Sequence, residues 1–410
     1  MIDKEIENLI NKEAKRQVEG VELIASENYV SKDVLECMGS ILTNKYSEGY
    51  PGKRYYGGNT YIDEIEQLAI DRAKELFHAD HVNVQPYSGS PANLAVHVAL
   101  LQTGDTTMSM SLSAGGHLSH GFKASVSGKY YNNITYGVDD NGYIDYDEVR
   151  RLANEYKPKL IWAGFSAYSR IIDWKEFRKI ADGVGAYLVA DISHVAGLVA
   201  SGCYPSPVGI ADVVTTTTHK TLRGPRGALI MCSDSLAKEI DKAVFPGIQG
   251  GPHNHIIAGI AVALKEASTE EFKEYSKQII KNAQTLAEAL QSRGYKIISG
   301  GTDNHMFLVN IVDSVGLTGE EASVTLESVN ITINKNTIPN DTRNTWDPSG
   351  IRIGVPAITT RGMKEKEMLQ ISSFVDEALR NHKDKNKLMN IKREVVDFSK
   401  KYPIPSISLY

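Results

Sequence analysis

Between about residues 60 and 250 the sequence alternates strand-like and helix-like segments, and this alternation limits the fold more than any other feature. Residues 62–77 have the apolar spacing of an amphipathic helix, and residues 159–165 form a short apolar run typical of a buried strand. A helix at 173–185, which ends near glycine, and a strand at 186–191 follow. Strands that alternate with helices favour a mainly parallel sheet with helices on both faces.

Two more strands are expected close together, at 211–220, which is rich in β-branched residues, and at 227–232. Because only a short segment separates them, we expect them to pair as a hairpin. A long helical region follows at about 255–293, and a second alternation of strands and helices begins after it. There, Thr318 and Glu321 have the spacing of a capping box at the start of a helix. The end of the chain therefore reads as a smaller α/β domain.

The first 45 residues read as a helical arm. Ile6, Ile10 and Ala14 recur at helical spacing on an otherwise polar segment, so this stripe needs a surface to lie on, such as a partner subunit. The predicted domains are the arm at 1–45, a large domain at 46–274 and a small C-terminal domain at 275–410.

Charge and composition exclude several classes of protein. The formal net charge of −5 leaves no basic excess to neutralise a phosphate backbone, so nucleic acid is not expected as a partner. No run of about 18 apolar residues occurs, and the charged N-terminal segment lacks the apolar stretch of a signal peptide. Cys37, Cys203 and Cys232 lie far apart without zinc or disulfide spacing, which favours a reducing compartment. We therefore expect a cytoplasmic protein without a membrane segment.

Two segments only superficially suggest metal binding. The acids of residues 139–148 do not fall at the alternate positions of a calcium loop, so we expect a turn there. His117 and His120 have a spacing that suits two metal ligands, but no third ligand is evident nearby. No metal site is predicted.

Ligands of open α/β sheets bind beyond the carboxyl ends of the strands, so polar residues at strand ends are candidates for a site. Ser88, Gly89 and Ser90 lie between a predicted strand at 82–86 and a helix at 91–101. Their hydroxyls and backbone N–H groups at a helix N-terminus suit a phosphate group. A simple capped helix start explains them equally well.

Asp191 closes the predicted strand 186–191, and Lys220 closes the predicted strand 211–220. The Asp191 carboxylate can pair with a protonated ring nitrogen, or it can cap the residues after it. A desolvated lysine is a neutral amine that attacks an aldehyde, although most lysines at strand ends are solvated charges. A pyridoxal-phosphate enzyme needs three such parts. They are a site for the phosphate group, an acid that pairs with the ring nitrogen, and a lysine that forms a Schiff base.

Eight segments resemble those of the serine hydroxymethyltransferase family, and they follow in order along nearly the whole chain. These segments are 44–58, 85–93, 115–121, 165–170, 191–198, 215–227, 245–252 and 349–354. The most specific are KYSEGYPGKRYYGG and TTTTHK followed by GPRG. The resemblance implies a pyridoxal-phosphate-dependent transferase fold of the aspartate-aminotransferase type. It also implies a homodimer or dimer of dimers with shared active sites.

The implied reaction moves the hydroxymethyl carbon of serine reversibly to tetrahydrofolate through an external aldimine, giving glycine and 5,10-methylenetetrahydrofolate. By this resemblance, Lys220 holds pyridoxal phosphate covalently, Asp191 pairs with the ring nitrogen, and His117 stacks on the ring. His194 and Ser166 lie near the ring's 3′ oxygen. The phosphate is held by Ser88, Gly89, Ser90 and His219, with Tyr46, Gly250 and Gly251 from the neighbouring subunit.

For the substrates, the resemblance implies that Arg352 binds the amino-acid carboxylate with its planar fork and that Ser26 and Tyr56 contact the substrate. Glu48 handles the proton on the serine hydroxyl or on folate, and Thr217 supports lysine exchange. The pterin site is lined by Leu112, Gly116, Leu118 and Asn336. The catalytic set is Lys220, Glu48, His194, Thr217 and Tyr56. From pattern alone, Arg352 reads as a solvated strand position and Glu48 as a loop acid beside a lysine.

Two other functions are considered. A folate-independent aldolase of threonine or another β-hydroxy amino acid needs the same lysine, aspartate and arginine but no folate pocket, and Glu48, Leu112 and Asn336 favour the folate enzyme. A non-catalytic scaffold or regulatory paralogue typically loses the lysine or the ring aspartate, and both are present here as Lys220 and Asp191.

Overall fold

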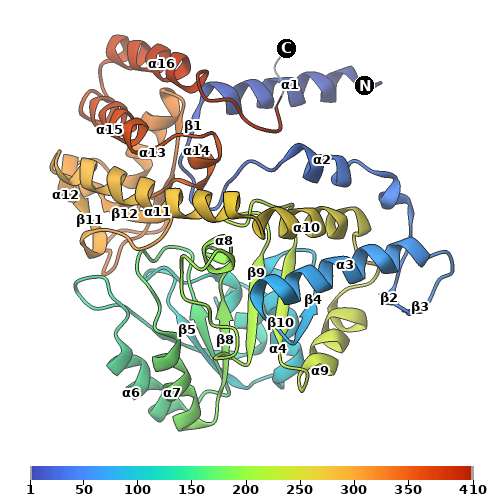
Figure 1. The fold of residues 1–410 in the computed structure, drawn as a ribbon. Helices are drawn as coiled ribbons and strands as arrows, with labels where there is room; N and C mark the ends of the chain where they lie inside the picture. Colours follow the sequence, from blue (N-terminus) through green and yellow to red (C-terminus); the bar gives the residue numbers. More distant parts are fainter. Residues whose placement is uncertain (1, 408–410) are drawn as a thin grey trace. The chain divides into compact units, whose positions relative to one another are not determined.

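The computed structural model describes residues 2–407, which form two compact units (Figure 1). The smaller unit comprises Met1–Tyr29, Ala167–Arg170 and Lys277–Tyr410, and the larger comprises Val30–Ser166 and Ile171–Ser276. The boundary between Ser276 and Lys277 falls inside helix α11 (Glu270–Gln291).

Among its described residues, the larger unit holds a seven-stranded sheet in the order β4-β10-β9-β8-β7-β5-β6. The strands are β4 (His81–Asn83), β5 (Thr106–Met110), β6 (Asn132–Tyr136), β7 (Leu160–Gly164), β8 (Tyr187–Asp191), β9 (Val213–Thr217) and β10 (Ala228–Cys232). Strands β5 to β9 pair in parallel, whereas β10 pairs antiparallel with both β9 and β4. The mainly parallel sheet and the hairpin of the last two predicted strands are therefore confirmed.

Helices surround this sheet in the larger unit. They are α2 (Lys32–Met38), η1 (Ile41–Asn44), α3 (Thr60–Phe77), α4 (Gly89–Leu100), η2 (Leu118–His120), α5 (Val126–Tyr130), α6 (Tyr146–Tyr156), α7 (Trp174–Val184), α8 (Ala196–Ala200), α9 (Ala237–Lys242), η3 (Ala243–Ile248) and α10 (Asn254–Ala267). Every residue of β7, β9 and β10 is buried, which requires cover on both faces of the sheet. On one face, Trp162 and Val189 pack in a core with Ala92 and Val96 of α4.

The smaller unit contains a four-stranded antiparallel sheet among its described residues, in the order β11-β12-β15-β14. Its strands are β11 (Lys296–Ile297), β12 (Met306–Asn310), β14 (Asn334–Asn336) and β15 (Gly350–Gly354). Its shorter elements and helices are η4 (Ile298–Gly300), α12 (Ile311–Val315), α13 (Gly319–Ser328), α14 (Pro356–Thr360), α15 (Glu365–Arg380) and α16 (Lys385–Ser399). Thr318 and Glu321 form the predicted capping box at the start of α13. The predicted α/β fold class is confirmed in both units.

The N-terminal segment is divided differently from the predicted arm at 1–45. Helix α1 (Lys4–Glu19) and strand β1 (Val21–Glu22) belong to the smaller unit, where β1 pairs in parallel with β13 (Ile331–Thr332). The boundary falls after Tyr29, because the backbone pairing of β1 and the contacts around Arg361 bind the first segment to this unit. Ile6 and Ile10 of the apolar stripe remain exposed.

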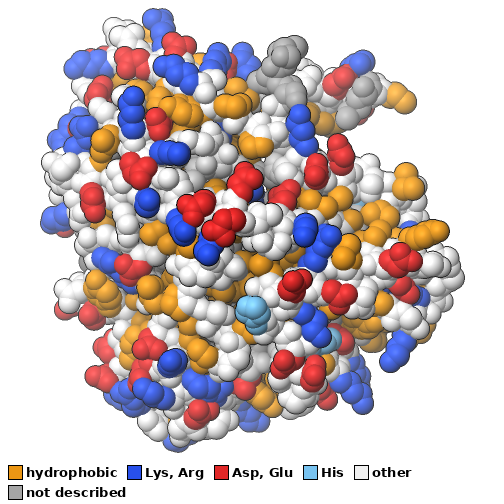
Figure 2. All heavy atoms as spheres, viewed as in Figure 1, with side chains coloured by type: hydrophobic (Ala, Val, Ile, Leu, Met, Phe, Trp, Pro, Cys, Tyr) orange, Lys and Arg blue, Asp and Glu red, His pale blue; other side chains and the backbone are white. Residues whose placement is uncertain are grey.

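Charged side chains are spread over the molecule. Figure 2 shows lysine and arginine side chains interspersed with aspartate and glutamate on the face that it draws. In the described part of the chain, no helix is both long enough and apolar enough to span a membrane. The predicted turn at 139–148 is confirmed, because Asp139 Oδ1 accepts hydrogen bonds from the N–H groups of Asn141 and Tyr143.

Buried Arg361 fastens the N-terminal segment to the smaller unit. Its Nη1 donates to Gly20 O at 2.7 Å, and its Nη2 donates to Val18 O at 3.0 Å and to Ser399 O at 2.6 Å. A lysine has no planar fork and cannot reach all of these carbonyls. The guanidinium therefore joins two segments from opposite ends of the chain.

We predict that Arg361→Lys lowers the free energy of unfolding by about 2–4 kcal/mol, because several buried carbonyls lose a charged donor. Urea unfolding of the purified protein measures this change. The control is Arg151→Lys, since Arg151 makes an exposed pair with Glu155 and should change stability by less than about 1 kcal/mol. Equal effects of the two substitutions would show that Arg361 does not fasten the segment.

Candidate active site

Asp191 ends strand β8 and is buried among hydrogen-bond donors. Its Oδ2 accepts from His120 Nε2 at 2.9 Å and from Asn93 Nδ2 at 2.8 Å, and its Oδ1 accepts from the Ser193 N–H at 3.0 Å. Burial alone would raise the pKa of Asp191, but the hydrogen bond and charge of His120 outweigh it and hold the pKa far below its usual range. The carboxylate is therefore ionised at neutral pH and suited to a cationic partner.

His120 and Asn93 are partners of Asp191 that the sequence analysis missed. The His120 ring stacks on Trp162 with centroids 4.7 Å apart, so its orientation is fixed by packing as well as by the carboxylate. The spacing of His117 and His120 suggests a metal pair, but in the structure His120 orients Asp191. Across residues 2–407, no three histidine, cysteine, aspartate or glutamate side chains are grouped so that they could bind a metal ion.

His117 lies next to this group. Its Nδ1 accepts from the Ser119 N–H at 3.2 Å, and Ser119 Oγ in turn accepts from Asn93 Nδ2 at 2.9 Å. Burial, with a contribution from His120, lowers the pKa of His117 to about 4. The His117 ring is therefore neutral at pH 7, which suits stacking against an aromatic cofactor.

The strand that leads to Lys220 ends earlier than predicted. β9 stops at Thr217, not at Lys220, because Thr218 turns the chain by hydrogen bonds from its Oγ1 to Pro225 O at 2.6 Å and from Gly224 N to its own carbonyl at 2.7 Å. Lys220 is buried three residues beyond the strand. Its charge contributes to the lowered pKa values of His117 and His219.

The ends of β8 and β9 are joined to each other. The Thr217 N–H donates to Ser193 Oγ at 3.0 Å, and Asp191 is paired in register with Thr215 on the neighbouring parallel strand. Because parallel strands end at the same edge of a sheet, the aspartate and the loop that carries Lys220 occupy one edge, as the strand order requires.

The start of α4 has the features of an anion site. Ser88 occupies the N-cap position, yet within the described residues its side chain makes no capping hydrogen bond, so the simple capped start does not describe it. Gly89 is required because a Cβ there would lie 2.7 Å from Thr217 Cγ2. The buried Nδ1 of His219 has no hydrogen-bond partner among residues 2–407, and burial, followed by the charge of Lys220, lowers the pKa of His219 to about 3. Ser90 is exposed. Backbone N–H groups, hydroxyls and an uncommitted ring nitrogen fit a phosphate group.

His194 and Ser166 lie in segments that follow β8 and β7. His194 is buried, its carbonyl accepts from Thr221 Oγ1 at 3.0 Å, and its ring centroid is 6.2 Å from that of Phe165. The Ser166 N–H donates to Gly115 O at 2.7 Å. That bond places Ser166 against the loop after β5, which carries the predicted pterin residues Leu112, Gly116 and Leu118.

A second group of predicted residues gathers where two glycine-rich loops meet. Tyr46 Oη donates to Glu48 Oε1 at 3.3 Å, and the rings of Tyr46 and Tyr56 are in edge-to-face contact with centroids 5.1 Å apart. A Cβ on Gly250 would lie 3.3 Å from Glu48 Oε1, and one on Gly251 would lie 3.3 Å from the Tyr46 ring. The charge of Glu48 raises the pKa of Tyr46, which keeps the phenol protonated as a donor.

Tyr87, which the sequence analysis did not assign, touches both groups of residues. It precedes Ser88 in the chain, and its Oη donates to Gly251 O at 2.8 Å. Its ring stacks on His253 with centroids 4.2 Å apart. Tyr87 therefore connects the start of α4 to the second glycine-rich loop.

Three predicted residues lie in the smaller unit. Arg352 is buried in β15, where its Nε donates to Asn334 Oδ1 at 2.9 Å, so the alternative of a solvated strand position is wrong. Burial lowers the pKa of Arg352 to about 10, which leaves the guanidinium cationic at neutral pH. Asn336 of β14 pairs with Gly350 of β15. Gly354, at the end of β15, packs against Ala25, and Ser26 is the next residue after Ala25.

Comparisons with known proteins agree in one family. The family model described as serine hydroxymethyltransferase matches residues 1–375. A protein named serine hydroxymethyltransferase from Nitrosococcus oceani is 56% identical over 405 residues, which cover 98% of this chain and 97% of the relative. Proteins of the same name from Legionella pneumophila strains Lens and Corby are each 58% identical over 398 residues, covering 96% of this chain and 95% of the Lens protein.

The match extends over nearly the full length of both partners, and it includes the segments that contain Asp191, Lys220 and Arg352. The chain belongs to the serine hydroxymethyltransferase family.

Proposed function

We propose that the chain transfers the hydroxymethyl carbon of serine reversibly to tetrahydrofolate, giving glycine and 5,10-methylenetetrahydrofolate, with pyridoxal 5′-phosphate held covalently at Lys220. Family membership supports the transferase activity. The main structural support for cofactor binding is that the ionised, buried Asp191 lies at the same sheet edge as the loop of Lys220. An acid held this way stabilises a protonated ring nitrogen.

The residues at this edge fit the cofactor. Pyridoxal phosphate, when bound, supplies an electron sink for the bonds at the α-carbon of the amino acid. Asp191 holds positive charge at the ring nitrogen, and the neutral His117 ring provides a flat face against the cofactor ring. The start of α4 and the His219 Nδ1 receive the phosphate. His194 and Ser166 surround the ring oxygen, and Thr217 supports exchange at Lys220.

We propose the following roles for the residues expected to bind the substrates. Arg352, cationic and fixed by Asn334, binds the amino-acid carboxylate, and Ser26 and Tyr56 contact the same molecule. Glu48 holds or moves the proton on the serine hydroxyl or on folate. The pterin ring is lined by Leu112, Gly116, Leu118 and Asn336.

We also propose a cytoplasmic homodimer or dimer of dimers in which Tyr46, Gly250 and Gly251 reach the neighbour's site. One support is the contact between the two glycine-rich loops, which lets them reach a neighbour together. A second is the exposure of Ile6 and Ile10 on α1.

The proposed function is tested by converting serine to glycine with and without tetrahydrofolate. We predict rapid glycine formation only when tetrahydrofolate is present, because the hydroxymethyl carbon needs an acceptor. Equal rates on threonine or serine without folate would favour the aldolase alternative. A protein that binds the cofactor but forms no glycine in either assay would favour the non-catalytic alternative.

The cofactor lysine is tested by borohydride reduction, which fixes a Schiff base irreversibly. We predict that peptide mapping then finds the label on Lys220 and that Lys220→Ala takes up no label. Lys159 and Lys53, which are exposed, serve as internal controls. A label on either of them with Lys220 unmodified would disprove the assignment.

Arg352→Ala is predicted to weaken binding of serine and glycine by about 2–5 kcal/mol, because a buried charge-assisted pair is lost. Titration of the variant with each amino acid measures the loss. Arg352→Lys keeps the charge but not the planar fork. Its affinity for serine and glycine should therefore lie between those of Arg352→Ala and the wild type. Pyridoxal phosphate should bind normally in both variants, and near-normal serine binding by Arg352→Ala would contradict the role.

A further inference from the structure

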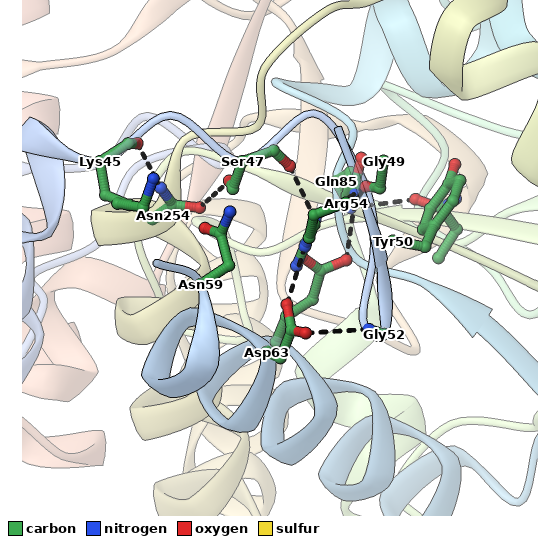
Figure 3. A network of polar contacts seen from close by, with 12 residues as sticks. Lys45, Ser47, Gly49, Tyr50, Gly52, Arg54, Asn59, Asp63, Gln85 and Asn254 are labelled. Carbon is green, nitrogen blue, oxygen red and sulfur yellow. Dashed lines mark hydrogen bonds and ion pairs between the residues drawn. The ribbon is translucent and has the colours of Figure 1, made fainter. Parts of the chain in front are cut away.

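Arg54 is almost completely buried beneath the loop that carries Glu48, with its side chain only 4% exposed. It lies in strand β3 (Lys53–Arg54), which forms a hairpin with β2 (Gly49–Tyr50). Its Nη1 donates to Ser47 O at 2.8 Å and to Gly49 O at 2.7 Å. Figure 3 shows Arg54 among Ser47, Gly49 and Asp63. In the sequence, Ser47 and Gly49 are the residues on either side of Glu48.

The rest of the guanidinium is bound to helix α3. Nε donates to Asp63 Oδ1 at 2.8 Å, and Nη2 donates to Glu66 Oε2 at 2.6 Å. Gln85 then links the same groups, because its Nε2 donates to Glu66 Oε1 at 2.6 Å and to Gly49 O at 2.9 Å. Arg54 therefore fixes the backbone around Glu48 relative to a rigid helix.

Arg54 is the cation that faces both carboxylates of this network. Glu66 is 1% exposed, and burial raises its pKa against the opposing effect of the Arg54 charge. A second carboxylate, Asp63, also accepts from the Gly52 N–H at 2.9 Å, within the same hairpin. Since an unpaired buried carboxylate is costly, the two acids hold the guanidinium in place while it holds the loop.

The Glu48 backbone is held from other directions as well. Its carbonyl accepts from the Tyr55 N–H at 3.0 Å, and Ser47 Oγ donates to Asn254 Oδ1 at 2.6 Å. Gly49 has φ of +97°, and a Cβ there would collide with Lys53 O, so only glycine lets the hairpin close here. The backbone is thereby pinned, while the Glu48 carboxylate reaches Tyr46.

We propose that Arg54 is the positioning residue for Glu48: by binding the carbonyls on both sides of it, Arg54 sets where the Glu48 carboxylate lies for proton transfer. The proposal rests on the function proposed above. Lysine cannot replace Arg54, because one ammonium cannot serve two carbonyls and two carboxylates in a plane. A displacement of about 1 Å at a catalytic group can cost on the order of 100-fold in rate.

The test is a double-mutant cycle between Arg54→Lys and Glu48→Gln in the folate-dependent assay. We expect Arg54→Lys to lower kcat by roughly 100-fold, with a change of less than about threefold in KM for serine. In the Glu48→Gln background, the same substitution should lower kcat by less than about threefold, because the group that it positions is already disabled. Two effects that simply multiply, or an unchanged kcat in Arg54→Lys, would overturn the proposal.

A crystal structure of Arg54→Lys provides a readout independent of activity. Residues 47–49 should shift while α3 keeps its place, and an unmoved Glu48 would count against the proposal. If Arg54→Lys does not fold, Asp63→Asn replaces it in the cycle, because that change keeps an acceptor near Nε but removes one charge that holds the guanidinium.

The matched control is Arg361→Lys, another buried arginine that clamps backbone carbonyls but makes its bonds in the smaller unit. Its effect on kcat should multiply with that of Glu48→Gln, which separates positioning from general loss of stability. An inactive wild-type protein would disprove the proposed function itself. An active wild type with multiplying effects would disprove only the role of Arg54.

Discussion

The hydrogen-bonded carboxylate of Asp191 is the interaction on which the rest of the site depends. A buried charge is tolerated only when donors replace water, and here His120, Asn93 and the Ser193 N–H do so. Each donor comes from a different part of the larger unit, so the aspartate can stay ionised only when the sheet, α4 and the loop after β5 are all in place. Asp191 therefore gives this edge of the sheet a buried negative charge that is suited to a cationic partner.

Much of this architecture could be predicted from the sequence because its signals are local. Apolar runs such as 159–165, glycine after α7 and the Thr318–Glu321 capping box depend on neighbouring residues, and the structure confirms them. Strand order then placed Asp191 and Lys220 at one edge. The predicted strand end at Lys220 was wrong, because the bond from Thr218 to Pro225 stops β9 at Thr217, and β-branched composition does not reveal such a bond.

The remaining parts depend on contacts between residues far apart in the chain. Asn93 and His120 read as an ordinary helix residue and a possible metal ligand until the fold brings them to Asp191. In the sequence Arg54 looks like any charged loop residue. Its burial is evident only in the fold, where it pairs with Glu66 of α3. The roles of Glu48 and Arg352 came from resemblance to a family, since charge and spacing alone favoured solvated side chains for both.

The smaller unit is assembled from segments at both ends of the chain, and this has a consequence for the order of folding. Strand β1 is synthesised among the first residues, but its parallel partner β13 is made only when the chain reaches Ile331. The sheet of the larger unit has all its strands once Cys232 has been made. During synthesis the sheet edge that carries Asp191 can therefore form before the N-terminal segment has its partner strand. Premature release of the chain would then leave a folded larger unit with an unpaired strand β1.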